Sequence, residues 1–261
     1  MKKLNAGLFV IVVTALTLAA CVSSSTLPGD KVSLQQASQY NVELGMSYLQ
    51  QGRRDLAMQK LQLALQQNSD NANAYMAIGL LYNTTGDAQR ADENYRTALR
   101  KAPDNPQIQN NYAVYLCQHG KPQQSEKYFL EAAQNPLYPT PEAAYTNAGV
   151  CANKIPDQAA AVQYFRRALD INPSFLDALY QMARMNYEQK QYLEARAFIE
   201  RFNAASPQPR PEILLLGVRI ELALGNKQGA ADYAKKLRIL FPDSPETLQL
   251  DQSYNNAGNT H

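Results

Sequence analysis

Tryptophan is absent from the 261-residue sequence, and glycine (12), histidine (2) and cysteine (3) are scarce. The modest glycine and proline content excludes a collagen-like or low-complexity chain. His119 stands next to a glycine and His261 is the last residue, so neither has the setting that a nucleophilic triad or a structural zinc site needs. Glycine-rich phosphate loops are also missing. The sequence therefore predicts a protein that is not an enzyme and that needs no metal or other cofactor.

An excess of charge of one sign is missing as well. The chain contains 25 basic and 23 acidic residues, and its first twenty residues hold two lysines and no acid, so 23 basic residues face 23 acidic ones in the remainder. Nucleic-acid binding relies on clustered Lys and Arg. We therefore expect no nucleic-acid partner and, without a catalytic constellation, no small-molecule substrate.

The N-terminal segment differs in kind from the rest of the chain. Two lysines precede the short apolar run from Leu8 to Leu18, which is the layout of a secretory signal peptide and too short for a membrane span. The tetrapeptide Leu18-Ala19-Ala20-Cys21 resembles the bacterial lipobox. That resemblance implies cleavage before Cys21 and acylation of its sulfur and amine, whereas an ordinary signal peptide with an incidental cysteine is the alternative. Val22, where inner-membrane lipoproteins carry Asp, implies the periplasmic face of the outer membrane.

Residues 1–20 are thus a predicted lipoprotein signal peptide, and the serine-rich residues 21–37, with Pro28-Gly29, a predicted flexible tether. At the other end, residues 243–261 predict a C-terminal tail whose last dozen residues fray.

Between these flanks the sequence repeats with a period close to 34. Small residues recur at such steps, and so do bulky apolar residues four positions later and glycines. The small residues are Ala57, Ala91, Ser125, Ala161 and Ala195; the bulky ones are Leu61, Tyr95, Phe129, Phe165, Ile199 and Tyr233; the glycines are Gly52, Gly86 and Gly120. Each period predicts two helices that pack closely at the small residues, with glycine in the turn between them.

This pattern resembles the tetratricopeptide repeat, in which a Leu-Gly pair precedes a Tyr in the first helix. Leu44-Gly45 with Tyr48 and Ile78-Gly79 with Tyr82 match it closely. We predict an all-α fold, a right-handed α-solenoid of six such repeats over residues 38–242. The repeats begin near residues 38, 72, 106, 142, 176 and 210, and two extra residues separate the third from the fourth.

Two cysteines remain inside the repeats. Cys117 and Cys151 both fall in the first helices of adjacent repeats, which pack side by side. The sequence leaves two possibilities open, a disulfide in an oxidising compartment or two buried apolar thiols.

Tetratricopeptide proteins bind partners in a concave groove lined by first helices, and the family's groove positions can be transferred to the first two repeats. The expected partner-binding residues are largely apolar, and methionine is adaptable at such surfaces. They are Val42, Met46, Leu49, Met76, Leu80 and Asn83. The groove could accept an amphipathic helix or an extended strand, or these residues could instead be core.

Several local strings resemble one family in particular. They are Asn110-Asn111-Tyr112-Ala113, Leu137-Tyr138-Pro139, Leu214-Leu215-Leu216-Gly217-Val218-Arg219 and Leu237-Arg238-Ile239-Leu240-Phe241-Pro242. With the lipobox and six repeats, the chain resembles the type IV pilus biogenesis and stability lipoproteins, the PilF/PilW pilotins. The resemblance implies a protein that binds the type IV pilus secretin, carries it to the outer membrane and promotes its oligomerisation. A scaffold lipoprotein for cell-wall enzymes or for outer-membrane protein assembly is the alternative.

Overall fold

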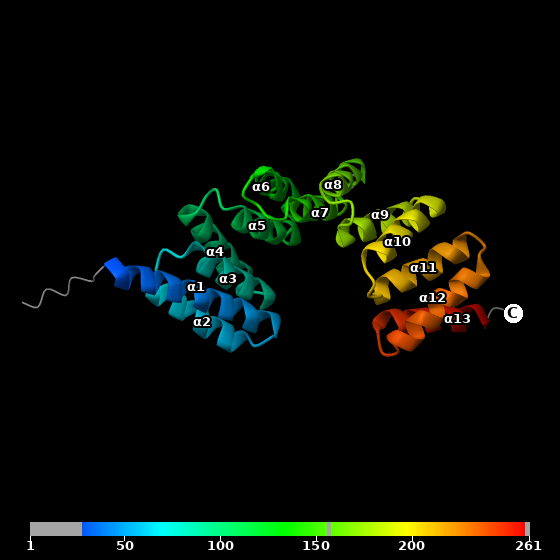
Figure 1. The fold of residues 1–261 in the computed structure, drawn as a ribbon, viewed down its shortest axis with the longest axis horizontal. Coiled ribbons are helices and arrows are strands. Elements are labelled where there is room, and N and C mark those ends of the chain that lie inside the picture. The colour runs from blue at the N-terminus through cyan, green and yellow to red at the C-terminus, as the bar shows by residue number, and fades with distance from the viewer. Residues whose placement is uncertain (1–27, 156–157, 259–261) are drawn as a thin grey trace, which may run out of the picture.

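The computed structural model describes residues 28–155 and 158–258, and within these ranges it contains thirteen α-helices and no strand. The helices are α1 (Pro28–Gln50), α2 (Arg54–Gln67), α3 (Ala72–Thr84), α4 (Ala88–Lys101), α5 (Pro106–Gln118), α6 (Pro122–Gln134), α7 (Pro141–Ala152), α8 (Gln158–Ile171), α9 (Leu176–Glu188), α10 (Tyr192–Ala205), α11 (Pro211–Ala223), α12 (Lys227–Leu240) and α13 (Pro245–Gly258). Together they form an arch whose two ends point the same way (Figure 1). None of them combines the length and the hydropathy that a membrane span requires.

Consecutive helices pack in pairs, and each pair is one repeat. The six pairs run from α1 with α2 to α11 with α12, and each first helix also contacts the first helix of the next repeat. The predicted all-α solenoid of six repeats is therefore confirmed. Because every repeat contacts mainly its neighbours, the core is a chain of small clusters along the arch and not one central core.

Helix ends follow from local sequence. The side chains of Asn71, Asp87 and Asn226 each accept a hydrogen bond from a backbone N–H in the first turn of the following helix. Four turns inside repeats hold a glycine with φ between 72° and 82°, at Gly52, Gly86, Gly120 and Gly225. Lys190 occupies the same place in the fifth repeat with φ 62°, a left-handed conformation that costs an L-residue free energy.

Glycine on a first helix lets the second helix of the same repeat approach closely. A Cβ on Gly149 would lie 2.5 Å from the Phe165 ring, and one on Gly79 would lie 3.1 Å from the Tyr95 ring. Both aromatic rings are fully buried. Two of the bulky residues that recur in the sequence thus pack into the space that a glycine leaves on the first helix of their repeat.

A group of tyrosines fills the junction between the second and third repeats. The Tyr112 ring lies 5.8 Å from that of Tyr95 and 5.2 Å from that of Tyr128, the latter edge-on. Tyr112 donates its hydroxyl to Asp92 (3.0 Å), and burial raises its pKa to about 12, so this hydroxyl stays a donor at physiological pH.

The predicted tether is too long at its C-terminal end. Residues 1–27, which include the predicted signal peptide and Cys21, lie outside the described residues, but α1 begins at Pro28 and takes in residues 28–37. Proline is tolerated in the first turn of a helix, and Leu34 and Ala37 are good helix formers. Ser38, fully buried, then fastens α1 by donating to the Ala64 carbonyl (2.8 Å).

The predicted frayed tail is wrong for most of its length. Residues 245–258 form α13, which packs against α11 and α12. Leu250 is buried beside Leu214 and Leu215, and Thr247 donates its hydroxyl to the Phe241 carbonyl (2.7 Å). The physical reason is that the last repeat of a solenoid exposes an apolar face that an additional helix can cover.

Candidate protein-binding groove

The inner side of the arch is built from the first helix of each repeat. Figure 1 shows α5 and α7 on the inner side and α6 and α8 on the outer side. Side chains that project from the first helices, and that are not used in packing one helix on the next, therefore face the space beneath the arch. This arrangement provides one surface that runs across several repeats.

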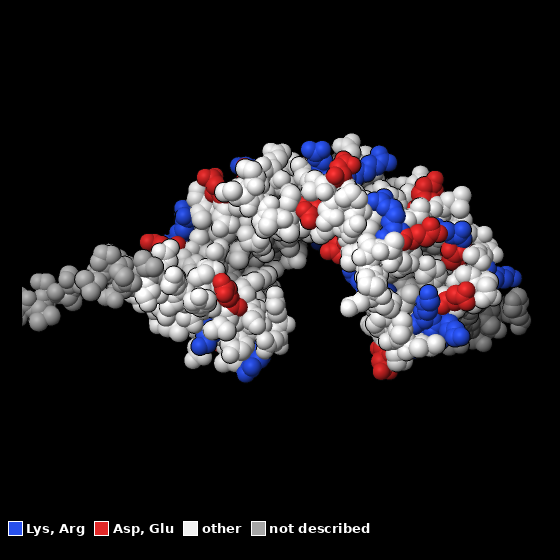
Figure 2. Space-filling model, viewed as in Figure 1, with Lys and Arg blue, Asp and Glu red and all other residues white. Residues whose placement is uncertain are grey.

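Charge is unevenly distributed over these inner helices. Neither α3 nor α5 contains an acidic or basic residue, α7 contains only Glu142, and α1 contains only Glu43 beyond its first turn. By contrast, α9 and α11 contain three charged residues each. On the visible face, Lys, Arg, Asp and Glu gather over the C-terminal part of the arch (Figure 2). The first four repeats thus present an inner surface that is nearly free of charge.

A hollow of about 410 Å³ lies on this surface where α1, α3 and the start of α5 meet. Three of the predicted groove residues line it, Val42, Met46 and Met76. Val42 and Met76 are 4% and 6% exposed, so they contribute mainly packing, while Met46 is half-buried. The structure therefore brings one half of the predicted set together.

The other half of the predicted set lies away from the hollow. Leu49 and Leu80 are half-buried and pack against the apolar clusters of the first repeats. Asn83 bridges to the end of α5, because its amide donates to the Gln118 side chain and its oxygen lies 2.9 Å from Nε2 of His119. These three residues join adjacent repeats and do not line the hollow.

Polar side chains supply the remainder of the lining. They are Gln39, Glu43, Ser47, Gln50, Asn73, Asn105 and Gln107. Next to the hollow, Asn111 donates to the Met76 sulfur (3.5 Å) and to the Gln107 carbonyl (2.7 Å). Amides offer a donor and an acceptor at once, which matches the N–H and C=O of a peptide backbone. The hollow can therefore hold an uncharged polypeptide segment.

Sequence reasoning missed part of this lining. Gln107 occupies the second position of the third repeat, a groove position of the family, so the same transfer applied to one more repeat would have found it. Glu43 and Ser47 occupy positions outside the family's groove positions, and nothing in the sequence indicated that they line the hollow.

A disulfide, one of the two possibilities that the sequence left open, joins two repeats at the middle of the arch. Cys117 on α5 and Cys151 on α7 form a disulfide, with the two Cα atoms 5.8 Å apart. Ser125 of α6 lies beside it, with its Oγ 3.1 Å from the Cys151 sulfur. The bond links the third repeat to the fourth inside a small apolar cluster, at the junction that carries the two extra residues.

Comparison with known proteins gives the family of the repeats and of the whole chain. Models of the tetratricopeptide repeat match residues 42–106, 84–140, 113–174 and 157–216, so the matches together cover more than half of the chain. The type IV pilus assembly protein PilF of Pseudomonas aeruginosa is 30% identical over 235 residues, which are 89% of this chain and 92% of that protein.

Two solved structures agree over nearly their whole length. The crystal structure of PilW, described as a widely conserved type IV pilus biogenesis factor, has a TM-score of 0.72 at 31% identity and covers 82% of this chain and 98% of its own. The structure of PilF from Pseudomonas aeruginosa has a TM-score of 0.71 at 28% identity and covers 85% and 99%. The chain therefore belongs to the PilF/PilW family of tetratricopeptide-repeat proteins of type IV pilus biogenesis.

Proposed function

We propose that this protein is a pilotin, an outer-membrane lipoprotein that binds the secretin of the type IV pilus, carries it to the outer membrane and promotes its oligomerisation. The observation that carries the proposal is the uncharged inner surface of the first four repeats, on a chain that belongs to a pilus biogenesis family. A groove of this kind holds a protein segment and performs no chemistry, so the mechanism is physical carriage.

The position of the groove supports this mechanism. If Cys21 is acylated, only six residues lie between the anchor and Pro28, where α1 begins. The seven residue steps from Cys21 to Pro28 span at most about 25 Å. The first repeats and their hollow are therefore held close to the membrane surface, so that a bound secretin subunit arrives beside the bilayer that it must enter.

The chemistry of the groove supports a protein ligand that offers backbone groups. Among the described residues, Glu43 is the only charged one that lines the hollow. Moving an acidic side chain into it would remove water from that charge and set it beside a second carboxylate, which disfavours acidic segments. An extended or helical segment of low charge would instead exchange backbone and apolar contacts with the amides, Met46 and Met76.

The anchor is tested with Cys21→Ala. We expect the unacylated protein to leave secretin monomers away from the outer membrane and to reduce surface pili strongly, measured by membrane fractionation and immunoblotting of secretin multimers. Normal amounts of outer-membrane multimers in this variant would contradict the pilotin role.

The groove is tested by placing charge in it without touching the core. Gln39→Lys combined with Gln107→Lys adds two cations to exposed positions of the hollow. The matched control, Gln59→Lys with Gln62→Lys, adds the same charge to exposed positions of α2. We expect the groove variant alone to lose co-purification of the secretin, with helical circular dichroism unchanged in both.

The same co-purification separates the alternative function. Recovery of peptidoglycan enzymes or barrel-assembly proteins in place of the secretin, lost in the groove variant and kept in the control, would overturn the proposal in favour of a general scaffold lipoprotein.

A further inference from the structure

A second hollow surface lies on the outer side of the arch, between α4 and α6. Its floor is formed by Gln109 and Tyr112 of α5. Two adjoining cavities of about 620 and 700 Å³ occupy it, and both are lined by Leu99 and Tyr128. We call this surface the outer groove. It is separate from the inner groove of the proposed function, because it is walled by second helices.

The two cavities carry opposite charge. The first contains the carboxylates of Asp104 and Glu131 and no basic residue. The second contains Arg96, Arg100 and Lys127 and no acidic residue. They share an apolar middle, where Leu99 and the Tyr128 ring form the walls. The outer groove is therefore a dipolar channel with an apolar centre.

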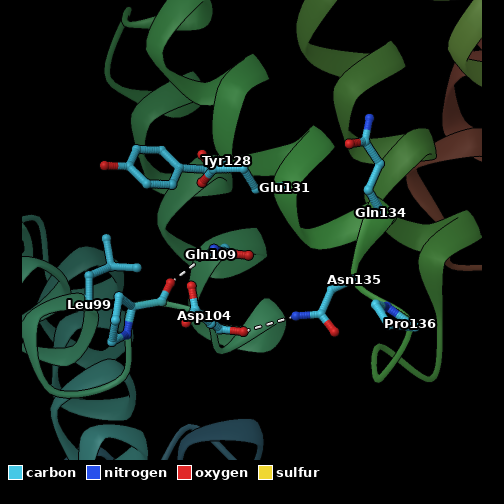
Figure 3. A pocket seen from close by; sticks show the side chains of 9 residues that line it. Leu99, Asp104, Gln109, Tyr128, Glu131, Gln134, Asn135 and Pro136 are labelled. Atoms are coloured by element: carbon cyan, nitrogen blue, oxygen red, sulfur yellow. Dashed lines mark hydrogen bonds between the residues drawn. The ribbon is translucent and has the colours of Figure 1, made fainter.

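The acidic cavity also holds a buried acceptor without a partner. Gln109 is 7% exposed, and its amide nitrogen donates to the Pro103 carbonyl (2.9 Å), the contact drawn at the centre of Figure 3. That bond fixes the orientation of the amide, since the reverse orientation would set two oxygens against each other. Gln109 lines the cavity, and its Oε1 atom, which is itself buried, has no hydrogen-bond partner among the described residues.

An unsatisfied acceptor of this kind has a free-energy cost that a donor from outside can remove. Two carboxylates stand at the same cavity, and Asn135 holds its rim in place by donating to the Asp104 carbonyl (3.0 Å) (Figure 3). Three acceptors with an apolar entrance match a guanidinium or ammonium group on an aliphatic stem.

The basic cavity matches the other end of such a ligand. Arg100 donates to the uncharged hydroxyl of Thr97 (2.7 Å), and Lys127 lies 3.7 Å from Glu131, a long ion pair. Arg96 is paired with Asp92 within its own helix. Arg100 and Lys127 are therefore placed to meet an incoming carboxylate.

We infer that the outer groove binds an extended segment of a partner protein whose basic side chain enters the acidic cavity and whose acidic side chain, further along the segment, meets Arg100 and Lys127. Leu99 and Tyr128 line both cavities, so one segment can reach both. An apolar side chain between the two charged ones packs against Leu99 and Tyr128.

The test uses a fluorescein-labelled, amidated nine-residue peptide with Arg, Leu and Glu at positions 3, 5 and 7 among Gly and Ser, and the full chain in detergent. Fluorescence anisotropy measures binding. Two further peptides carry Arg or Glu at both charged positions. We expect the dipolar peptide to bind about tenfold more tightly than either, since each loses one charge-assisted contact.

Variants then locate the site. Asp104→Asn with Glu131→Gln should weaken the dipolar peptide about tenfold, and Gln109→Met, which keeps the size of the side chain, should weaken it severalfold while the thermal midpoint changes little. Glu93→Gln on the exposed face of α4, outside both cavities, is the matched control and should bind as the wild type does. No saturable anisotropy change, or equal weakening by the control, would overturn the inference.

Discussion

The inner helices of the first four repeats and those of the last two share one architecture but differ in how many charged residues they contain. In the first four, α1, α3, α5 and α7 contribute two charged residues beyond the first turn of α1, and adjacent repeats are held by tyrosine packing and one disulfide. In the last two, charged residues are paired within the chain. Arg196 of α10 bonds both carboxylate oxygens of the buried Glu221 on α11, and Arg210 contacts Glu212 and Asp177.

The difference is between an inner surface whose side chains can contact a partner and one whose charged side chains are bonded within the chain. Charges that already have partners inside the chain join one repeat to the next and leave little to offer a ligand. The amides of the first repeats and the half-buried Met46 remain able to contact an external segment. Under the proposed function, the N-terminal part of the arch binds the partner, and the charged side chains of the C-terminal part join one repeat to the next.

The disulfide gives the largest expected effect in the uncharged part. Replacing both cysteines, Cys117→Ala with Cys151→Ala, removes a cross-link that closes a loop of 34 residues. On the loop-entropy estimate, the unfolding free energy should fall by about 3–4 kcal/mol. Urea unfolding followed by circular dichroism measures it.

A reductant provides the control for this prediction. It should lower the urea midpoint of the wild type and leave that of the double variant unchanged. If the wild type is equally stable with and without reductant, the two repeats are not held by a disulfide.

Glu221 is the corresponding element of the charged part. Its Oε1 accepts from Nε of Arg196 (2.8 Å), and its Oε2 accepts both from Arg196 and from the Asn226 amide (2.6 Å). Glu221→Gln keeps only one of the two oxygens and sets its own NH₂ against a donor of Arg196, so we expect a loss of about 2 kcal/mol in unfolding free energy. Glu200→Gln, on the exposed face of α10, should cost less than about 0.5 kcal/mol.

A second substitution makes this prediction specific. Asn226→Asp keeps the cap of α12, whose first-turn amide it accepts, and turns the donor into an acceptor. Combined with Glu221→Gln it should restore part of the lost stability. If the losses of stability in the two single variants simply add in the double variant, then the charge of Glu221 and not its hydrogen bonds accounts for its contribution.

Features that recur with the repeat period could be predicted from the sequence, whereas features that occur only once in the chain could not. Repeat boundaries and the positions of the two cysteines on adjacent first helices both follow from the 34-residue spacing. The helix α13 and the start of α1 occur once, outside the period, so the sequence predicts a tether around Pro28 and a tail over residues 243–261.

The groove was predictable only in part, for a related reason. Transferred positions identify the face of a first helix, and Met46 and Met76 indeed reach the hollow. They do not show how far the next repeat covers that face. Leu80 and Asn83 are taken up by contacts with the third repeat, which depend on how the repeats stack and not on the periodicity of one helix.

The turn of the fifth repeat gives the smallest and most local test. Lys190, in the charged part of the arch, adopts φ 62° where four other repeats have glycine. A left-handed conformation costs an L-residue about 1–2 kcal/mol, and glycine avoids this cost. Glycine also makes the unfolded chain more flexible, which offsets part of the gain in stability. We therefore expect Lys190→Gly to stabilise the protein by about 0.5–1 kcal/mol.

The reciprocal change in the uncharged part is Gly120→Ala, at φ 72° with nothing within 4 Å of an added Cβ. It should destabilise by about 1 kcal/mol through backbone strain alone. Measured together by urea unfolding, opposite signs would show that the two turns are equivalent and that the fifth repeat tolerates strain that the third avoids. If Lys190→Gly is neutral or destabilising, contacts of the lysine side chain outweigh the strain of its backbone, and the turn is not a weak point of the charged part.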